Sequence, residues 1–279
     1  MKISEAFKAY ARDVIVFKNQ SKKTEENHFI CCKALVVFFD DVEIESLTFS
    51  MIRDWKAELD KHRSHETVRN YIIKLRVVLK YLRERGHNCL RPDEIPVPKR
   101  TDKVPIFITE SEVSRLIVGA KKLRNKAIVS LLYGSGIRVS ELCNLDIADI
   151  KDMSFTVVGK GSKARICFID DRTKYLLDEY LATRNDNYPY LFTGKYTSQR
   201  ITPGNVQEIF RIARKNAGFQ KPVHPHTLRH SFATNLLRNN ANIRYVQTLL
   251  GHSSLDTTMQ YTHVVDEDLR KVYREHHTI

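Results

Sequence analysis

The sequence predicts a mainly α-helical protein with one small β-sheet, arranged as two domains. Apolar residues recur at the three- and four-residue spacing of amphipathic helices along most of the 279-residue chain. Two short stretches, residues 155–158 and 164–168, instead have the composition of strands. Prolines and basic residues interrupt the helical pattern at residues 91–107. A chain of this length has room for a domain on each side of that interruption.

The first domain, residues 1–90, is expected to be a small bundle of four amphipathic helices. The apolar residues with helical spacing fall in four stretches, which are Phe7–Phe17, Cys32–Phe39, Ile52–Leu59 and Val68–Leu82. Basic residues gather on or beside the fourth stretch, namely Lys74, Arg76, Lys80, Arg83 and Arg85. This cluster makes the fourth helix a candidate for contact with a polyanionic partner.

The segment 91–107 is expected to be an extended, basic linker. Its prolines, Pro92, Pro96, Pro98 and Pro105, are incompatible with a continuing helix or a central strand. Lys99, Arg100 and Lys103 add positive charge. The sequence therefore places the domain boundary here.

The second domain, residues 108–279, is expected to begin with a helix, because Thr109 and Glu112 have the spacing of a capping box. Helical patterns continue to about Leu145. The glycine-rich turn Gly159–Ser162 joins the two expected strands and predicts a hairpin. Further helices are expected near residues 170–183, 203–216, 227–239, 242–250, 254–261 and 266–275.

The charge favours a polyanionic partner. Forty-six Lys and Arg residues against 33 Asp and Glu give a formal net charge of +13, which is typical of proteins that bind nucleic acid. Ribosomal and membrane-surface proteins share this property. No apolar run approaches the roughly 20 residues that span a bilayer, and the N-terminus lacks the apolar core of a signal peptide. A cytoplasmic protein is expected, without membrane association.

The cysteines are expected to be reduced and mostly buried. There are five, they show no C-x-x-C spacing, and no secretion signal accompanies them. This pattern argues against a disulfide framework.

Four patches of the second domain combine residue types suited to phosphate chemistry. They are Gly136–Leu142 (GIRVSEL), Gly159–Arg165 (GKGSKAR), His226–His230 (HTLRH) and Leu250–Ser254 (LGHSS), and Tyr261-Thr262-His263 follows nine residues after His252. The planar guanidinium groups of Arg138 and Arg229 are suited to bidentate phosphate contacts, which lysine cannot reproduce. His226 and Arg229 are three residues apart, so that one helical face can present both.

These patches resemble those of the tyrosine recombinases of the phage integrase family, particularly the Xer-like recombinases. That family has an arginine in G-x-R-x-x-E-L, a hairpin lysine, an H-x-L-R-H helix, a later His or Trp in L-G-H, and a tyrosine nucleophile, in the order found here. The resemblance covers essentially all of residues 108–279, and over residues 1–90 it depends on the helical pattern alone. It implies a SAM-like core-binding domain followed by a mixed α/β tyrosine recombinase catalytic domain.

The resemblance implies a catalytic set in which each residue matches its own motif. The set is Arg138, Lys160, His226, Arg229, His252 and the nucleophile Tyr261. Tyr261 would form a 3′-phosphotyrosyl bond to DNA, Lys160 would protonate the leaving 5′ oxygen, and His252 would hydrogen-bond a non-bridging oxygen. Lys163 is a rival to Lys160 as the acid.

The residues themselves support this chemistry. The phenol of Tyr261 has an ordinary pKa of about 10 and needs activation, which surrounding Arg and His charge would supply. Glu141 follows Arg138 by three residues and can orient its guanidinium. The tyrosine link conserves the phosphodiester energy, so that rejoining needs no ATP. No cofactor is expected.

A metal site is not expected either. His226, His230 and His252 have no Cys or carboxylate at a recognisable zinc-ligand spacing, and His230 is expected to be a packed, structural residue. The pairs Asp40-Asp41 and Asp170-Asp171 raise a two-metal nuclease as an alternative. Both pairs lie where helix ends or turns are expected, which favours solvated caps.

The family resemblance also implies how the enzyme would assemble. Four protomers would bind two specific sites on double-stranded DNA and exchange strands through a Holliday junction. The purpose would be resolution of chromosome or plasmid dimers, or integration and excision of a mobile element. The segment Val264–His277 has apolar residues at helical spacing and is expected to be a C-terminal helix exchanged between subunits.

Two alternative functions remain open. A type IB topoisomerase-like enzyme would use the same chemistry without partner exchange and would relax supercoils at no specific site. A DNA-binding module that has lost catalysis would bind DNA without forming a covalent adduct.

Overall fold

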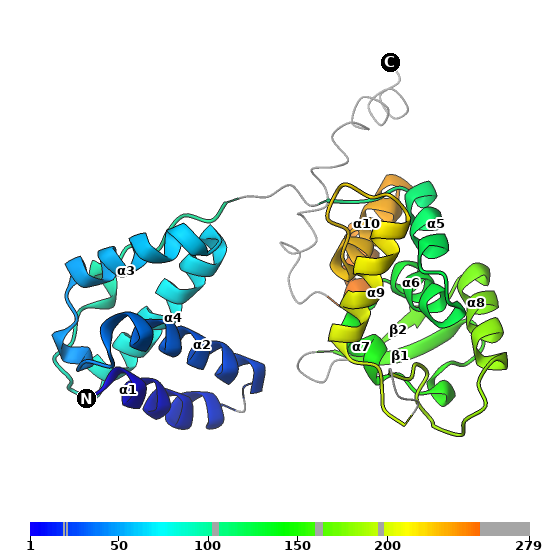
Figure 1. Ribbon diagram of the computed structural model, residues 1–279. Coiled ribbons are helices and arrows are strands. Elements are labelled where there is room, and N and C mark those ends of the chain that lie inside the picture. Colours follow the sequence, from blue (N-terminus) through cyan, green and yellow to red (C-terminus); the bar gives the residue numbers. More distant parts are fainter. Residues whose placement is uncertain (19, 21, 102–105, 160–163, 195–197, 252–279) are drawn as a thin grey trace, which may run out of the picture. The chain divides into compact units, whose positions relative to one another are not determined.

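The computed structural model describes residues 1–18, 20, 22–101, 106–159, 164–194 and 198–251 (Figure 1). The chain divides into two compact units, Met1–Lys103 and Val104–Ile279. Helices dominate both, and the described residues contain one two-stranded sheet. The expected fold class is therefore confirmed.

The first unit is built from the four expected helices. They are α1 (Ile3–Tyr10), α2 (Lys22–Phe39), α3 (Phe49–His62) and α4 (His65–Arg83), with a π-helical segment, Ala11–Val16, directly after α1. Their apolar faces enclose a core in which Phe7, Leu35, Trp55 and Leu75 are almost completely buried. Burial of such side chains, at about 1.5–3 kcal/mol each, is the main force that holds the bundle together.

Residues 91–101, within the segment expected to be a linker, pack along α4 and belong to the first unit. Arg76 Nη1 donates to the carbonyl oxygen of Ile95 at 2.6 Å, and Arg69 Nε donates to that of Pro98 at 3.1 Å. Prolines have no N–H and cannot enter a regular ladder, so these carbonyl groups need side-chain donors. The basic residues of α4 supply them.

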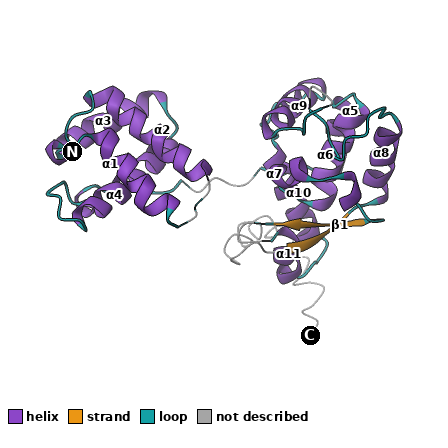
Figure 2. Cartoon of the chain, turned by 90° about the horizontal axis from the view of Figure 1, so that it is seen from below, coloured by secondary structure: helices purple, strands orange, loops and turns teal. Residues whose placement is uncertain are grey.

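The second unit contains the remaining helices and both strands (Figure 2). In chain order these are α5 (Glu110–Gly119), α6 (Leu123–Ser135), α7 (Val139–Asn144), β1 (Ser154–Val158), β2 (Ala164–Phe168), α8 (Asp171–Ala182), α9 (Pro203–Asn216), α10 (Pro225–Arg238) and α11 (Ile243–Leu250). Helix α6 is central, with its residues 127–132 all buried, and it packs against α5, α8 and α10. The helices expected at 254–261 and 266–275 lie outside the described residues.

The expected capping box at the start of α5 is confirmed. Thr109 Oγ1 accepts a hydrogen bond from the backbone N–H of Glu112 at 3.3 Å, and Glu112 Oε2 accepts one from the N–H of Thr109 at 2.9 Å. Each side chain thus satisfies a backbone donor that the helix leaves unpaired.

The two strands pair antiparallel, with Val158 opposite Ala164 and Thr156 opposite Ile166. Side chains alternate between the two faces of the sheet. The inner face carries Phe155, Val157, Cys167 and, unexpectedly, the charged Arg165.

One residue of each acidic pair accepts hydrogen bonds near the start of a helix. Asp41 Oδ1 accepts from the backbone N–H of Ser4, and Asp41 Oδ2 from its hydroxyl, both at 2.8 Å. Asp170 Oδ1 accepts from the N–H of Thr173 at 2.7 Å at the start of α8. Within the described residues, no group of three or more His, Cys, Asp or Glu side chains is placed to hold a metal ion.

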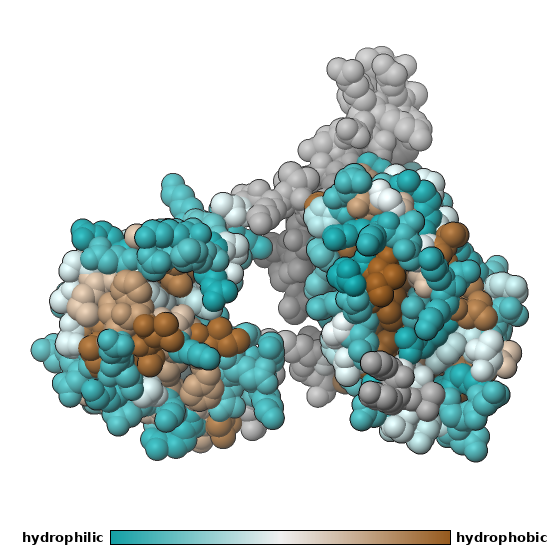
Figure 3. Space-filling view, in the orientation of Figure 1, coloured by the Kyte–Doolittle hydropathy of each residue, from teal (hydrophilic) through white to brown (hydrophobic). Residues whose placement is uncertain are grey.

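The five cysteines are free and buried, as expected, and burial raises the pKa of the Cys143 and Cys167 thiols to about 11. On the face of each unit seen in Figure 3, hydrophilic side chains cover most of the surface, and apolar side chains gather in a patch on each unit. None of the helices in the described ranges has the length and apolar character needed to cross a membrane.

Candidate active site

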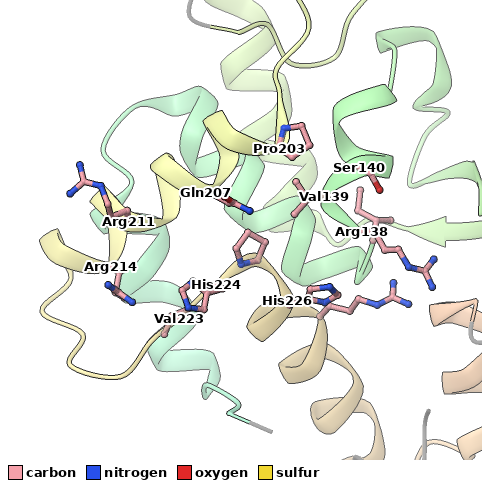
Figure 4. Close-up of a pocket in the computed structure, with 13 residues that line it drawn as sticks. Arg138, Val139, Ser140, Pro203, Gln207, Arg211, Arg214, Val223, His224 and His226 are labelled. Atoms are coloured by element: carbon pink, nitrogen blue, oxygen red, sulfur yellow. The ribbon is translucent and has the colours of Figure 1, made fainter. Parts of the chain in front are cut away.

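A cavity of about 650 Å³ in the second unit lies between α7, α9 and the start of α10 (Figure 4). Its lining is Ile137, Arg138, Val139, Ser140, Pro203, Gln207, Arg211, Arg214, Val223, His224, Pro225, His226 and Arg229. Arg138 and His226 lie at one side, whereas Arg211 and Arg214 project from α9 at the other. Among the described residues, no acidic side chain lines the cavity. Its chemistry therefore favours an anion.

Helix α10 presents two of the expected catalytic residues to this cavity. The helix begins at Pro225, whose ring suits the first helical position. Thr227 Oγ1 accepts a hydrogen bond from the backbone N–H of His224 at 3.1 Å, and this bond fixes the backbone at the N-cap of the helix. His226 and Arg229 follow in the first turns, near the positive end of the helix dipole. The helix thus adds to the positive potential of its own side chains.

Arg229 is held in place by the turn that ends α6. Gly136 adopts φ +62°, and a Cβ at this position would lie 2.5 Å from a ring carbon of Phe232. Only glycine fits this left-handed, crowded turn. The turn points the carbonyl oxygen of Gly136 at Arg229 Nη1, which donates to it at 2.6 Å. The Arg229 residue is only 3% exposed.

Glu141 binds both Arg138 and Arg165. Arg138 Nη1 donates to Glu141 Oε1 at 2.9 Å, and the backbone N–H of Arg138 donates to Oε2 at 2.8 Å. Arg165 contacts both carboxylate oxygens, with Nη1–Oε1 at 2.9 Å and Nη2–Oε2 at 2.6 Å. Burial opposes ionisation of Glu141, but the hydrogen bonds and charges of the two arginines outweigh it and lower its pKa to about 2.

Three arginines converge on the C-terminal end of α11. Arg165 Nε donates to the carbonyl oxygen of Leu249 at 2.9 Å, Arg229 Nη2 donates to that of Leu250, and Arg138 Nη2 lies 3.4 Å from that of Gly251. The last carbonyl groups of a helix lack partners and form its negative pole, which favours such donors. The carbonyl groups at the end of α11 are thus shared contacts of Arg138 and Arg229, the two arginines expected to bind phosphate.

The histidines beside these arginines favour their neutral forms. Burial lowers the pKa of His226, and the positive charges of Arg229 and Arg138 lower it further. Burial, together with His226 and Arg229, lowers the pKa of His230 to about 4. The rings of His226 and His230 lie 6.1 Å apart. At neutral pH a neutral His226 can accept a proton.

The structure brings together four of the residues singled out in the sequence. Arg138 and Glu141 belong to the start of α7, and His226 and Arg229 belong to α10; the two helices lie far apart along the chain and meet beside one cavity. The other members of the expected set, Lys160, His252 and Tyr261, lie outside the described residues, as does Lys163.

Sequence reasoning missed Arg165, Arg211 and Arg214. No local pattern in the sequence indicates Arg165, because an apolar-inward alternation of β2 would bury Ile166 and Phe168, whereas the structure exposes both and places Arg165 on the inner face. A charged residue on the inner face of a strand needs a buried partner. Arg211 and Arg214 are three residues apart on α9 and appear in the sequence as ordinary solvated basic residues.

Comparisons with known proteins identify the family of the chain. Residues 106–268 match the family model described as the phage integrase family. The tyrosine recombinase XerA of Pyrococcus horikoshii is 38% identical over 214 residues, covering 75% of this chain and 74% of XerA. The tyrosine recombinase XerD of Oceanobacillus iheyensis is 36% identical over 232 residues, covering 78% of each chain.

A solved structure shares the fold. The crystal structure of the XerH site-specific recombinase, bound to a palindromic difH substrate in a post-cleavage complex, matches with a TM-score of 0.72 and 20% identity. The match covers 92% of this chain and 80% of XerH. The family model covers more than half of the chain, and the identities to XerA and XerD extend over three quarters of it. The chain therefore belongs to the phage integrase family and is an Xer-like tyrosine recombinase.

Proposed function

We propose that the cavity beside α7 and α10 binds the scissile phosphate of double-stranded DNA and that the chain cuts and rejoins DNA at specific sites. The observation that carries this proposal is that Arg138, Arg229 and His226 line one cavity. Phosphoryl transfer depends mainly on positioning and on stabilising charge at the non-bridging oxygens. Two guanidinium groups and a helix N-terminus meet both requirements.

Tyr261 is the proposed nucleophile. Its phenol oxygen attacks the phosphorus, the bond from phosphorus to the 5′ oxygen breaks, and a 3′-phosphotyrosyl bond forms. His226, neutral at pH 7 because burial and neighbouring arginines lower its pKa, is suited to accept the phenol proton. Lys160 donates a proton to the leaving 5′ oxygen, and His252 hydrogen-bonds a non-bridging oxygen. Attack by the free 5′ hydroxyl of another strand reverses these steps and completes the exchange.

The first unit is proposed to grip the duplex as a core-binding domain. Lysine and arginine contacts to phosphates supply most of the affinity in such complexes. On α4, Lys80 is suited to this role because its side chain is 73% exposed, and its ion pair with Glu84, at 3.9 Å, lies in solvent where phosphate can replace it. Arg69 and Arg76, in contrast, already donate to backbone carbonyl groups of the same unit.

The active assembly is proposed to be a homotetramer on two DNA sites, with strand exchange through a Holliday junction. The segment Val264–His277 would pack into a neighbouring subunit. Deleting residues 266–279 should then impair cooperative assembly on DNA, as followed by native gel electrophoresis. Unchanged assembly of the truncated protein would argue against subunit exchange through this segment.

The nucleophile is tested by trapping the covalent adduct. Wild-type protein is incubated with nicked duplexes of randomised sequence, and the DNA that stays attached after denaturation is sequenced. Adducts enriched in one sequence define the recombination site, whereas relaxation of supercoils without a preferred site would favour the topoisomerase-like alternative. Tyr261→Phe should bind the recovered site without forming an adduct. Tyr245→Phe is the control, because Tyr245 is 72% exposed on α11; an adduct formed by Tyr261→Phe would refute the assignment.

The general acid is tested with sulfur in place of the bridging 5′ oxygen, because a thiolate leaves without a proton. Lys160→Ala should cleave the normal site poorly, by about 10²–10⁴-fold, and should recover on the sulfur-containing site. Lys163→Ala provides the comparison. Recovery of Lys163→Ala alone would assign the role to Lys163.

A further inference from the structure

Arg165 on β2 is buried beside the catalytic cavity, and the proposed chemistry gives it no role. Its side chain is 7% exposed, and that of its partner Glu141 is 8% exposed. Removing a charge from water is costly, so a buried arginine persists only where its N–H groups are well used. Arg165 does not line the cavity and therefore does not bind its contents directly.

We propose that Arg165 is a positioning residue, which fixes the guanidinium of Arg138 through Glu141 and ties strand β2 to the end of α11. This inference rests on the proposed function of the cavity, and it concerns how that cavity is kept in its working geometry.

The contacts of Arg165 require a guanidinium. Nη1 and Nη2 bind the two oxygens of Glu141, while Nε binds the carbonyl oxygen of Leu249. Three donors in one plane thus reach two elements at once, which a lysine ammonium cannot reproduce. With Arg165 in place, the carboxylate of Glu141 has one orientation, in which Oε1 also accepts from Arg138 Nη1.

The same contacts fix the end of α11, which lies beside the strands (Figure 2). The methylene and guanidinium groups of Arg165 also fill the space next to Gly251, where an added Cβ would lie 3.0 Å from Arg165 Cδ. Gly251 directly precedes His252 in the sequence. Arg165 therefore sets both the orientation of Arg138 and the point at which the chain leaves α11 toward His252 and Tyr261.

The test compares Arg165→Met with Arg184→Met on the site recovered by adduct trapping. Arg184 is a matched control, because its side chain is also 7% exposed and binds Asp186 and backbone carbonyl groups away from the cavity. Arg165→Met should slow cleavage by roughly 10–100-fold, the range expected when a catalytic group shifts by about 1 Å. DNA affinity should change much less. Arg165→Lys should not restore the rate, and Arg184→Met should cleave normally.

A methylphosphonate at the scissile position separates positioning of Arg138 from general damage to the fold. This group lacks one non-bridging negative charge and depends less on a correctly placed guanidinium. The deficit of Arg165→Met relative to wild type should therefore shrink on this substrate. Glu141→Gln combined with Arg165→Met should be no slower than the slower single variant, because both changes break one chain of contacts. An equal deficit on both substrates, or additive effects, would overturn the proposal.

A measurement without DNA keeps this inference distinct from the proposed function. The guanidinium nitrogens of Arg138 can be followed by ¹⁵N NMR, in which an anchored group gives separate, slowly exchanging signals. Arg165→Met should average the Arg138 signals, while Arg184→Met should not. Unchanged signals would refute the positioning role of Arg165, whereas failure of the wild-type protein to form any adduct would refute the function of the cavity instead.

Discussion

The glycine at the end of α6 offers a quantitative test of how the site is built. Gly136→Ala meets two penalties, because the residue has φ +62° and an added Cβ would lie 2.5 Å from the ring of Phe232. The left-handed conformation costs an alanine about 1–2 kcal/mol. Overpacking of a well-filled interior adds about 1–3 kcal/mol. The free energy of unfolding should therefore fall by roughly 2–5 kcal/mol, the sum of these terms.

Gly218→Ala separates the two penalties. Gly218 has φ +70°, and nothing lies within 4 Å of an added Cβ there. This variant should therefore lose only the conformational cost of about 1–2 kcal/mol. Urea unfolding followed by circular dichroism measures both variants. Gly136→Ala should also cleave DNA more slowly than Gly218→Ala, because a shifted turn moves the carbonyl oxygen that holds Arg229. Equal losses of stability for the two variants would refute the crowding argument.

Two further predictions concern titration of the site. Arg138→Met should raise the pKa of His226, because a positive charge that disfavours the imidazolium is removed. NMR titration of the histidine ring measures this, and an unchanged pKa would show that the charge of Arg138 does not contribute. Glu141 has a folded-state pKa of about 2 against an ordinary value of 4.5, so the stability that it contributes is present above about pH 4.5 and lost as the pH falls toward 2. Glu141→Gln should flatten the decline of unfolding free energy across this window; an unchanged pH profile would contradict the buried contacts of the carboxylate.

Much of the fold could be predicted from the sequence, because most helices keep one buried face. Helix α4 buries Val68, Ile72, Leu75 and Leu79 at helical spacing, and its extent follows directly from them. The start of α2 was harder to predict. Phe29, Ile30 and Val37 remain partly exposed on that helix, so its apolar residues do not fall on one side.

The site was only partly predictable from the sequence. The motifs identify the residues that are expected to contact phosphate, but not the residues that position those side chains. The pairing of Glu141 with Arg165 joins residues 24 apart, and the contact of Arg138 with Gly251 joins residues 113 apart. Such contacts depend on how α7, β2 and α11 pack, which no local pattern specifies. The packing of residues 91–101 on α4 could not be predicted for the same reason. The hydrogen bonds between these two segments join arginine side chains to backbone carbonyl groups, which leave no pattern in the sequence.

The fastening of residues 95–98 by arginines of α4 alters how the protein should respond to ionic strength. The affinity of a protein for DNA falls as the salt concentration rises, and the slope is proportional to the number of cations that its lysines and arginines displace from phosphates. Arg69 and Arg76 contribute to the formal charge of +13, yet each guanidinium already donates one N–H to the backbone of its own unit, which restricts its reach toward a phosphate. Fewer counterions should therefore be displaced from the duplex than the composition alone suggests, and affinity should weaken correspondingly less as salt is added.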